Sequence, residues 1–135
     1  MDTPLIKIED LHKSFDTQKV LDGVSLEIKR GESIVVIGQS GCGKSVLLKH
    51  LIRLMEPDSG QVFFDGEDIS KLTFEQLTSL RRRFGMLFQS AALFDSMTVW
   101  ENVGFSLLRS KKMTPKEVKA IASEKLRLVG LGGVE

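Results

Sequence analysis

The feature that most constrains the fold is an apolar run that leads directly into a glycine-rich loop. Residues 33–37 (Ser-Ile-Val-Val-Ile) are rich in β-branched side chains, as in a strand that is covered on both faces. Residues 38–45 match the pattern G-x-x-x-x-G-K-[S/T] at every position. Leu47, Leu48 and Leu51 then recur at helical spacing, followed by Ile52 and Met55. This order of strand, loop and helix predicts an α/β fold with a phosphate-binding loop.

The residue types of this loop suit a nucleoside triphosphate. Glycines allow backbone N–H groups to point at phosphate oxygens, and the following helix N-terminus adds partial positive charge. The Lys44 ammonium can reach the β- and γ-phosphates, and the Ser45 hydroxyl can ligate Mg²⁺. Cys42 occupies a variable position and is interpreted as filler. The predicted phosphate-binding residues are Gly38, Gln39, Ser40, Gly41, Cys42, Gly43, Lys44, Ser45 and Val46.

Further strands and helices are predicted on both sides of the loop. Alternating apolar residues predict strands at residues 6–8, with a continuation over 12–15, and at residues 24–28. Residues 61–64 and 85–88 are predicted as shorter strands. A capping box at Thr73 and Gln76 predicts one helix start, and a second box at Thr114 and Glu117, with Pro115 between them, predicts another.

Composition excludes several classes of protein. A chain of 135 residues with 41% hydrophobic content is about one globular domain. Its 19 basic and 18 acidic residues give a net charge of +1, which argues against a nucleic-acid binder. The single cysteine excludes an internal disulfide and fits a reducing compartment. We find neither a secretory signal nor an apolar run long enough to span a membrane, so we expect a cytosolic domain.

Three segments around the loop resemble the ATP-binding cassette (ABC) ATPases. Residues 11–15 and 20–26 are similar to the family's opening strands, in which Phe15 takes the place of an aromatic ring that stacks on adenine, with Val20 beside it. Residues 86–89 resemble the Q-loop, whose glutamine, here Gln89, contacts Mg²⁺ and the attacking water. Residues 92–103 resemble the segment that receives the coupling helix of the permease. Each feature alone has a simpler reading: a core or edge phenylalanine, a solvated glutamine, an ordinary apolar core.

The resemblance covers essentially the whole chain and implies its organisation. It implies a P-loop NTPase (ABC ATPase) fold that is incomplete, with an N-terminal antiparallel β part and core over about 1–90 and the start of a helical subdomain over about 91–135. It assigns ATP and Mg²⁺ as cofactors, Lys44 and Gln89 as catalytic residues, and Ser45 and Gln89 as metal ligands. The implied partners are a permease, bound through the segment after Gln89, and a second ATP-binding subunit in a homodimer.

The same resemblance implies coupling of ATP binding and hydrolysis to transport, on the inner face of the cytoplasmic membrane. Residues 93–96 (Leu-Phe-Asp-Ser) and 101–105 look most like ATPases of Mla/Mce-type lipid-trafficking transporters. Importers of polar amino acids and of sugars share much of this sequence. An importer of another small solute therefore stays open beside a phospholipid transporter.

Several elements of ABC hydrolysis are not found in these 135 residues. We find no LSGGQ signature, no acidic strand end with its catalytic glutamate, and no switch histidine; neither His12 nor His50 fits that role. We therefore expect that the chain alone does not hydrolyse ATP. The strand at residues 33–37 also needs parallel neighbours, so we expect a marginally stable or oligomeric chain, or part of a longer protein.

Two other classes of protein remain as alternatives. One is another phosphate-loop enzyme, such as a GTPase or a small-molecule kinase; the chain has no Asn-Lys-x-Asp element, which a GTPase would use to read guanine. The other is a non-catalytic module that holds nucleotide or competes for the permease. Measurable ATP affinity without turnover distinguishes the module from an active enzyme.

Overall fold

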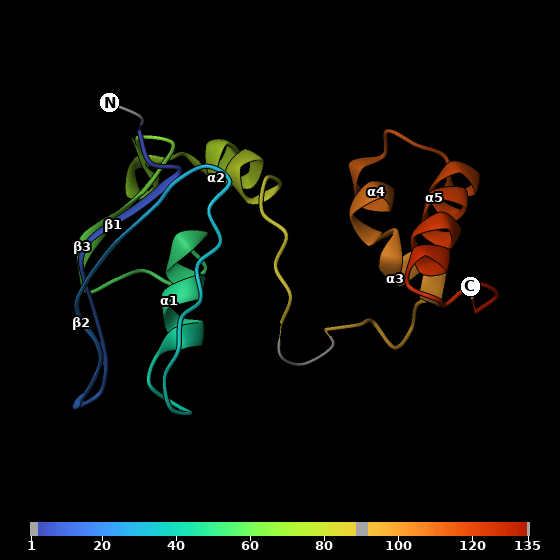
Figure 1. The fold of residues 1–135 in the computed structure, drawn as a ribbon. Helices are drawn as coiled ribbons and strands as arrows, with labels where there is room; N and C mark the ends of the chain where they lie inside the picture. The colour runs from blue at the N-terminus through green and yellow to red at the C-terminus, as the bar shows by residue number, and fades with distance from the viewer. Residues whose placement is uncertain (1–2, 89–91, 135) are drawn as a thin grey trace. The chain divides into compact units, whose positions relative to one another are not determined.

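The computed structural model describes residues 3–88 and 92–134. The chain divides into two compact units, Met1–Met86 and Leu87–Glu135. The first unit contains four strands and three helical segments (Figure 1): β1 (Ile6–Phe15), β2 (Gln18–Ile28), α1 (Lys44–Leu51), β3 (Ser59–Phe64), β4 (Glu67–Asp68), the 3₁₀ helix η1 (Ile69–Lys71) and α2 (Phe74–Arg81).

The sheet of the first unit has the order β2-β1-β3-β4, and all its pairings are antiparallel. Strand β1 lies between two neighbours, so Ile6 pairs with Ile28 of β2 on one side and with Phe64 of β3 on the other. Ile6 and Ile8 are buried while Lys7 is half-buried, which is the alternation that the sequence predicted. The predicted antiparallel β part is confirmed.

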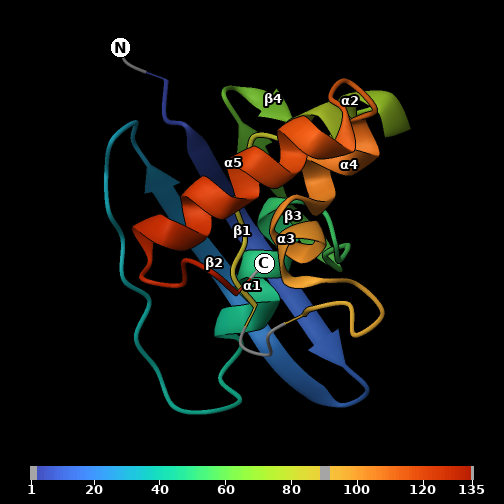
Figure 2. The ribbon, with the colours of Figure 1, turned by 90° about the vertical axis from the view of Figure 1, so that its right-hand side faces the viewer.

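Helices α1 and α2 contribute to the same core as the sheet, and Figures 1 and 2 show both helices beside it. The predicted capping box of α2 is present: Gln76 N–H donates to Thr73 Oγ1 over 3.3 Å, and Thr73 N–H donates to Gln76 Oε1 over 2.8 Å. Helix α1 ends sooner than its apolar spacing predicts, because Arg53 has a φ of +51°. The core consists of Ile6, Ile8, Leu11, Leu21, Leu47, Val62, Phe64, Ile69, Leu77 and Leu80.

Two predicted buried strands are wrong as local predictions. Residues 33–37 and 85–88 form no strand, and Val35, Ile37 and Leu87 are 81%, 89% and 97% exposed. A parallel strand forms only beside neighbours that satisfy its backbone groups, however apolar its own sequence. Among the described residues no strand pairs with either segment.

The second unit is helical and contains α3 (Val99–Val103), α4 (Phe105–Ser110) and α5 (Pro115–Leu128). Helix α5 begins with the predicted capping box of Thr114 and Glu117, which confirms its predicted start, and it buries Val118, Ala122 and Leu126. Helices α3 and α4 were not predicted. No helix within residues 3–88 and 92–134 is both long enough and apolar enough to cross a bilayer.

Candidate nucleotide-binding site

The glycine-rich loop leads into the first turn of α1, as predicted. Gly43 is the N-cap of this helix with φ +98°, and Gly41 has φ +81°; both values lie in the left-handed region that favours glycine. Leu47 N–H donates to the Gly43 carbonyl over 2.8 Å, which closes the first helical turn. The first turn of α1 carries no acidic residue. The partial positive charge of the helix N-terminus is therefore not offset locally, which favours an anion there.

The Lys44 ammonium folds back over the loop. It donates to the Gly38 and Gln39 carbonyls over 2.7 Å each and lies 3.6 Å from Cys42 Sγ. An ammonium has three protons to donate, and a phosphate oxygen is a stronger, charged acceptor than a carbonyl. Lys44 can therefore exchange a loop carbonyl for phosphate without leaving the loop.

The other loop residues differ in their surroundings. A Cβ at Gly38 would lie 2.5 Å from Cys42 Sγ, so a larger residue there requires the cysteine side chain to shift. Gln39, Ser40 and Ser45 are exposed, and Val46 is half-buried against the core of the first unit. The Ser45 side chain is thus open to solvent on the first turn of α1.

Strand β2 contacts the phosphate loop directly. A Cβ at Gly43 would lie 2.8 Å from Val20 Cγ1 and 3.0 Å from the Val20 carbonyl oxygen. Val20 follows the turn that joins β2 to Phe15, and Phe15 pairs with Gln18 across that turn. The structure thus brings Val20 against the phosphate loop and holds Phe15 on the same hairpin.

The Phe15 ring is 42% exposed, so it is not a core side chain. The Lys13 ammonium lies 5.7 Å from the ring centroid. An exposed aromatic ring can stack on a flat purine with little change in its own surroundings. The arrangement therefore combines a phosphate cradle with an aromatic platform on a neighbouring hairpin.

The glutamine predicted as catalytic residue and metal ligand, Gln89, lies outside the described residues. In the second unit, the segment before α3 is held by Asn102 through four hydrogen bonds. Its amide nitrogen donates to three backbone carbonyls, and its Oδ1 accepts from Phe94 N–H over 2.8 Å. Leu93 and Phe94 are 65% and 48% exposed, so neither is buried core.

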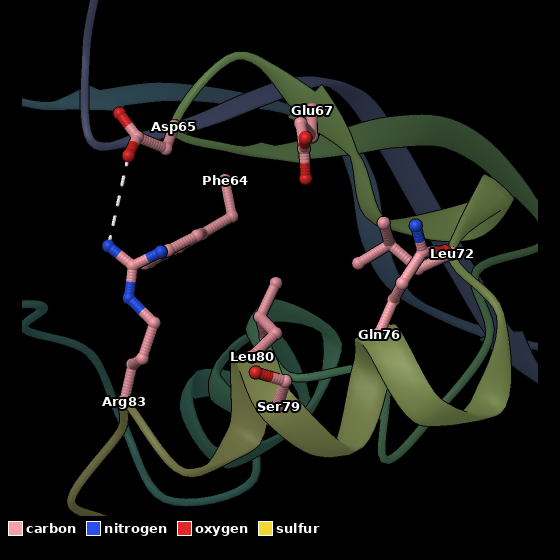
Figure 3. Close-up of a pocket in the computed structure, with 8 residues that line it drawn as sticks. All are labelled: Phe64, Asp65, Glu67, Leu72, Gln76, Ser79, Leu80 and Arg83. Atoms are coloured by element: carbon pink, nitrogen blue, oxygen red, sulfur yellow. Dashed lines mark ion pairs between the residues drawn. The ribbon is translucent and has the colours of Figure 1, made fainter.

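A cleft of about 280 Å³ lies elsewhere in the first unit, between the β3–β4 turn and α2 (Figure 3). Asp65 pairs with Arg30 over 2.6 Å and with Arg83 over 3.8 Å, and the Arg83 guanidinium lies 4.6 Å from the Phe64 ring centroid. Carboxylates would repel a triphosphate, and none of the predicted binding residues lines the cleft. It is lined by Phe64, Asp65, Glu67, Leu72, Gln76, Ser79, Leu80 and Arg83.

Two polar residues beside these segments were not predicted from the sequence. The carboxylate of Asp58 contacts the end of β1, and no local pattern in the sequence points to this contact. The family resemblance at residues 92–103 and 101–105 includes Asn102 but assigns no role to its side chain. The pattern Thr98-Val99-Trp100-Glu101 carried a signal for the helix start beside it, because a capping box with Glu101 is present in the structure.

Comparison with known proteins agrees with this geometry. Residues 21–134 match the family described as ABC transporter. The "Probable ribonucleotide transport ATP-binding protein mkl" of Mycobacterium leprae is 44% identical over 130 residues, which are 96% of this chain and 38% of that protein. The Arabidopsis thaliana "Protein TRIGALACTOSYLDIACYLGLYCEROL 3, chloroplastic" is 45% identical over 132 residues, 97% of this chain and 38% of that protein.

A solved structure extends the comparison to three dimensions. The ATP-binding cassette MJ0796, a dimer in a post-hydrolysis state bound to ADP and Pi, matches with a TM-score of 0.84 and 30% identity. The match covers 95% of this chain and 58% of that one. The chain thus has the P-loop fold of that cassette and spans 38% of the length of the two curated relatives.

Proposed function

This chain belongs to the ABC transporter family, and on that premise we propose that it is the nucleotide-binding part of an ATPase subunit that drives transport. The observation that carries the proposal is the close approach of Val20 to the Gly43 backbone, which leaves no room for a Cβ and joins the phosphate loop to the hairpin that bears Phe15. One part of the site is suited to phosphate and the other to a purine. Phe15 stacks on adenine and Val20 lies beside the base, while residues 38–46 hold the phosphates.

The phosphates are bound by backbone N–H groups of the loop, by the N-terminus of α1 and by Lys44. Lys44 moves from the Gly38 and Gln39 carbonyls to the β- and γ-phosphates. There it offsets the charge that develops as the phosphoryl group is transferred. This is the catalytic role that we propose for Lys44.

Mg²⁺ would be held by the Ser45 hydroxyl and by Gln89. The described residues contain no cluster of three or more His, Cys, Asp or Glu side chains suited to a metal. A single hydroxyl nevertheless fits Mg²⁺, because this ion keeps several waters and is coordinated in part by substrate phosphates. Mg²⁺ held at Ser45 would supply Lewis-acid polarisation of the phosphate oxygens.

We propose that the chain alone binds ATP without sustained turnover. The family resemblance assigns activation of the attacking water to a glutamate that we do not find in these 135 residues. Gln89 would contact that water but, as a neutral amide, cannot take its proton. In the intact subunit, ATP binding would close a homodimer and hydrolysis would reopen it.

The segment before α3 is the proposed contact with a permease. Asn102 fixes its backbone, Leu93 and Phe94 remain exposed on it at 65% and 48%, and Val99 at the start of α3 is 43% exposed. The Phe94 ring packs on Phe105 with centroids 4.7 Å apart, so a rigid apolar surface is presented. A partner helix with an apolar face fits such a surface. This contact would place the subunit on the inner face of the cytoplasmic membrane.

We propose phospholipid or another lipid as the cargo of the transporter. The support is the resemblance of residues 93–96 and 101–105 to lipid-trafficking ATPases, together with a relative whose name refers to the lipid trigalactosyldiacylglycerol. Another relative of equal coverage carries a ribonucleotide transport name, so a small-solute importer is the competing cargo class. Binding of nucleotide without transport, as an interaction module, is the competing function.

Titration of the chain with Mg-ATP by calorimetry tests the proposed site. Lys44→Ala should weaken ATP binding by about tenfold or more, since charge-assisted hydrogen bonds contribute about 1.5–3 kcal/mol. Lys49→Ala is the matched control, because Lys49 lies in the last turn of the same helix. Equal ATP affinity of the Lys44→Ala variant and the parent would refute the proposed site. Sustained phosphate release by the parent chain would refute binding without turnover.

A further inference from the structure

Asp58, between α1 and β3, is bound to three successive residues of β1. Its backbone N–H donates to the His12 carbonyl over 2.9 Å. Its carboxylate accepts from Lys13 Nζ over 2.7 Å and from Ser14 N–H over 2.6 Å. These contacts end at the residue immediately before Phe15.

The position of Asp58 in the sheet explains why these contacts matter. The β1–β3 pairing ends at His12 and Ser59, while β1 continues along β2 as far as Phe15 and Gln18. The last residues of β1 therefore have a strand neighbour on one side only. The Asp58 carboxylate takes the place of the next β3 residue by accepting the Ser14 N–H. It extends the ladder to the base of the Phe15 side chain.

The ion pair acts on the Phe15 ring as well. The Lys13 side chain is only 18% exposed, and Asp58 holds its ammonium 5.7 Å from the ring centroid. A cation over one face of a ring leaves the other face for stacking. The Lys13 ammonium and the Ser14 N–H also hold the pKa of Asp58 below its usual value, so the carboxylate is ionised at neutral pH.

We propose that Asp58 is a positioning residue for the adenine-binding ring, which fixes the backbone before Phe15 and keeps Lys13 on one face of it. This inference rests on the proposed function, in which Phe15 stacks on the base. Asp58 has no role toward the phosphates in this scheme. Removal of its carboxylate should therefore weaken the binding of ligands that carry a base. The affinity for ligands that carry only phosphates should not change.

Calorimetric titration of the full 135-residue chain with Mg-ATP and with Mg-tripolyphosphate separates the two parts of the site. Asp58→Ala should weaken ATP binding about two- to five-fold, the range of an exposed cation–π contact, with no change for tripolyphosphate. Asp58→Asn keeps an oxygen for the Ser14 N–H and should lose less ATP affinity than Asp58→Ala. Lys13→Met keeps the alkyl stem and should reproduce the selective loss for ATP.

A double-mutant cycle and a matched control complete the design. Once Phe15→Ala is present, Asp58→Ala should have no further effect on ATP affinity. Asp65→Asn removes a carboxylate with a similarly short ion pair, 2.6 Å to Arg30, and should leave both affinities unchanged. Circular dichroism melts of all variants report whether the fold is retained.

The outcomes separate this inference from the proposed function. An equal loss for ATP and tripolyphosphate in Asp58→Ala, or an additive cycle, would show a merely structural role and overturn the inference. If Phe15→Ala weakens ATP binding while Asp58→Ala and Lys13→Met do not, only the positioning role of Asp58 is overturned. If Phe15→Ala leaves ATP affinity unchanged, the stacking role in the proposed function is overturned as well.

Discussion

Replacement of Gly43 by alanine is expected to destabilise the first unit far more than the same change at Gly41. Both glycines lie in the phosphate loop with positive φ values, +98° and +81°. They differ in what a side chain would meet. A Cβ at Gly43 would lie 2.8 Å from Val20 Cγ1, whereas a Cβ at Gly41 has no atom within 4 Å.

The expected magnitude follows from these two terms. A left-handed conformation costs an L-residue about 1–2 kcal/mol, and this term applies to both positions. Overpacking adds about 1–3 kcal/mol, and only Gly43 has the close contact that causes it. Gly43→Ala should therefore lower the free energy of unfolding by about 2–5 kcal/mol and Gly41→Ala by about 1–2 kcal/mol.

Urea unfolding without nucleotide, followed by circular dichroism, measures this difference free of any effect on binding. Val20→Ala removes the nearest carbon atom, so Gly43→Ala should cost less in that background. The Gly41→Ala cost should not change there. Two results would refute the contact between β2 and the loop. One is an equal loss of unfolding free energy for the two glycine substitutions. The other is a loss for Gly43→Ala that is the same in the parent and in the Val20→Ala background.

Three further predictions concern the helical unit. Asn102→Ala removes four hydrogen bonds and should destabilise this unit by about 2–3 kcal/mol. Hydrogen exchange at the Met97 amide, which donates to the Phe94 carbonyl, should become faster. Unchanged exchange would contradict the role of Asn102. Thr114→Ala removes the cap of α5 and should lower the free energy of unfolding in urea by about 1 kcal/mol. Ser106→Ala, at an exposed position, should change it little. Equal changes for the two variants would argue against the cap. The Thr114 N–H and hydroxyl hold the pKa of Glu117 below its usual value, so this stabilisation is complete above pH of about 4.3 and is lost as pH falls through the lower folded-state pKa. Helical circular dichroism should fall over that range in the parent and less in Glu117→Gln, and the same fall in both would contradict the assignment.

Features of local origin were predicted well from the sequence. The capping boxes at Thr73 and Thr114 depend on residues three positions apart, and both are present. The alternation at Ile6 and Ile8 likewise predicted a strand with one buried face. Such patterns need no knowledge of distant chain segments, because the interacting groups are neighbours in the sequence.

Features that depend on distant segments were predicted only in part. The composition of residues 33–37 predicted a strand, but strand formation needs a partner elsewhere in the chain, and none is paired with it among the described residues. The contacts of Val20 with Gly43 and of Asp58 with Ser14 join segments more than twenty residues apart. Nothing in the local pattern at Asp58 distinguishes a turn residue from one that fixes a neighbouring strand.

The exposed segment at residues 33–37 has a thermodynamic consequence for the loop that follows it. The phosphate loop contacts α1 and Val20 on one side, and on the other it continues into residues 33–37, which form no strand with any other segment of residues 3–88 and 92–134. If nucleotide binding restricts this entry to the loop, part of the binding free energy is spent on that loss of conformational freedom. Any strand that pairs with residues 33–37 reduces that entropic cost and tightens ATP binding. By reciprocity, ATP strengthens that pairing by the same factor.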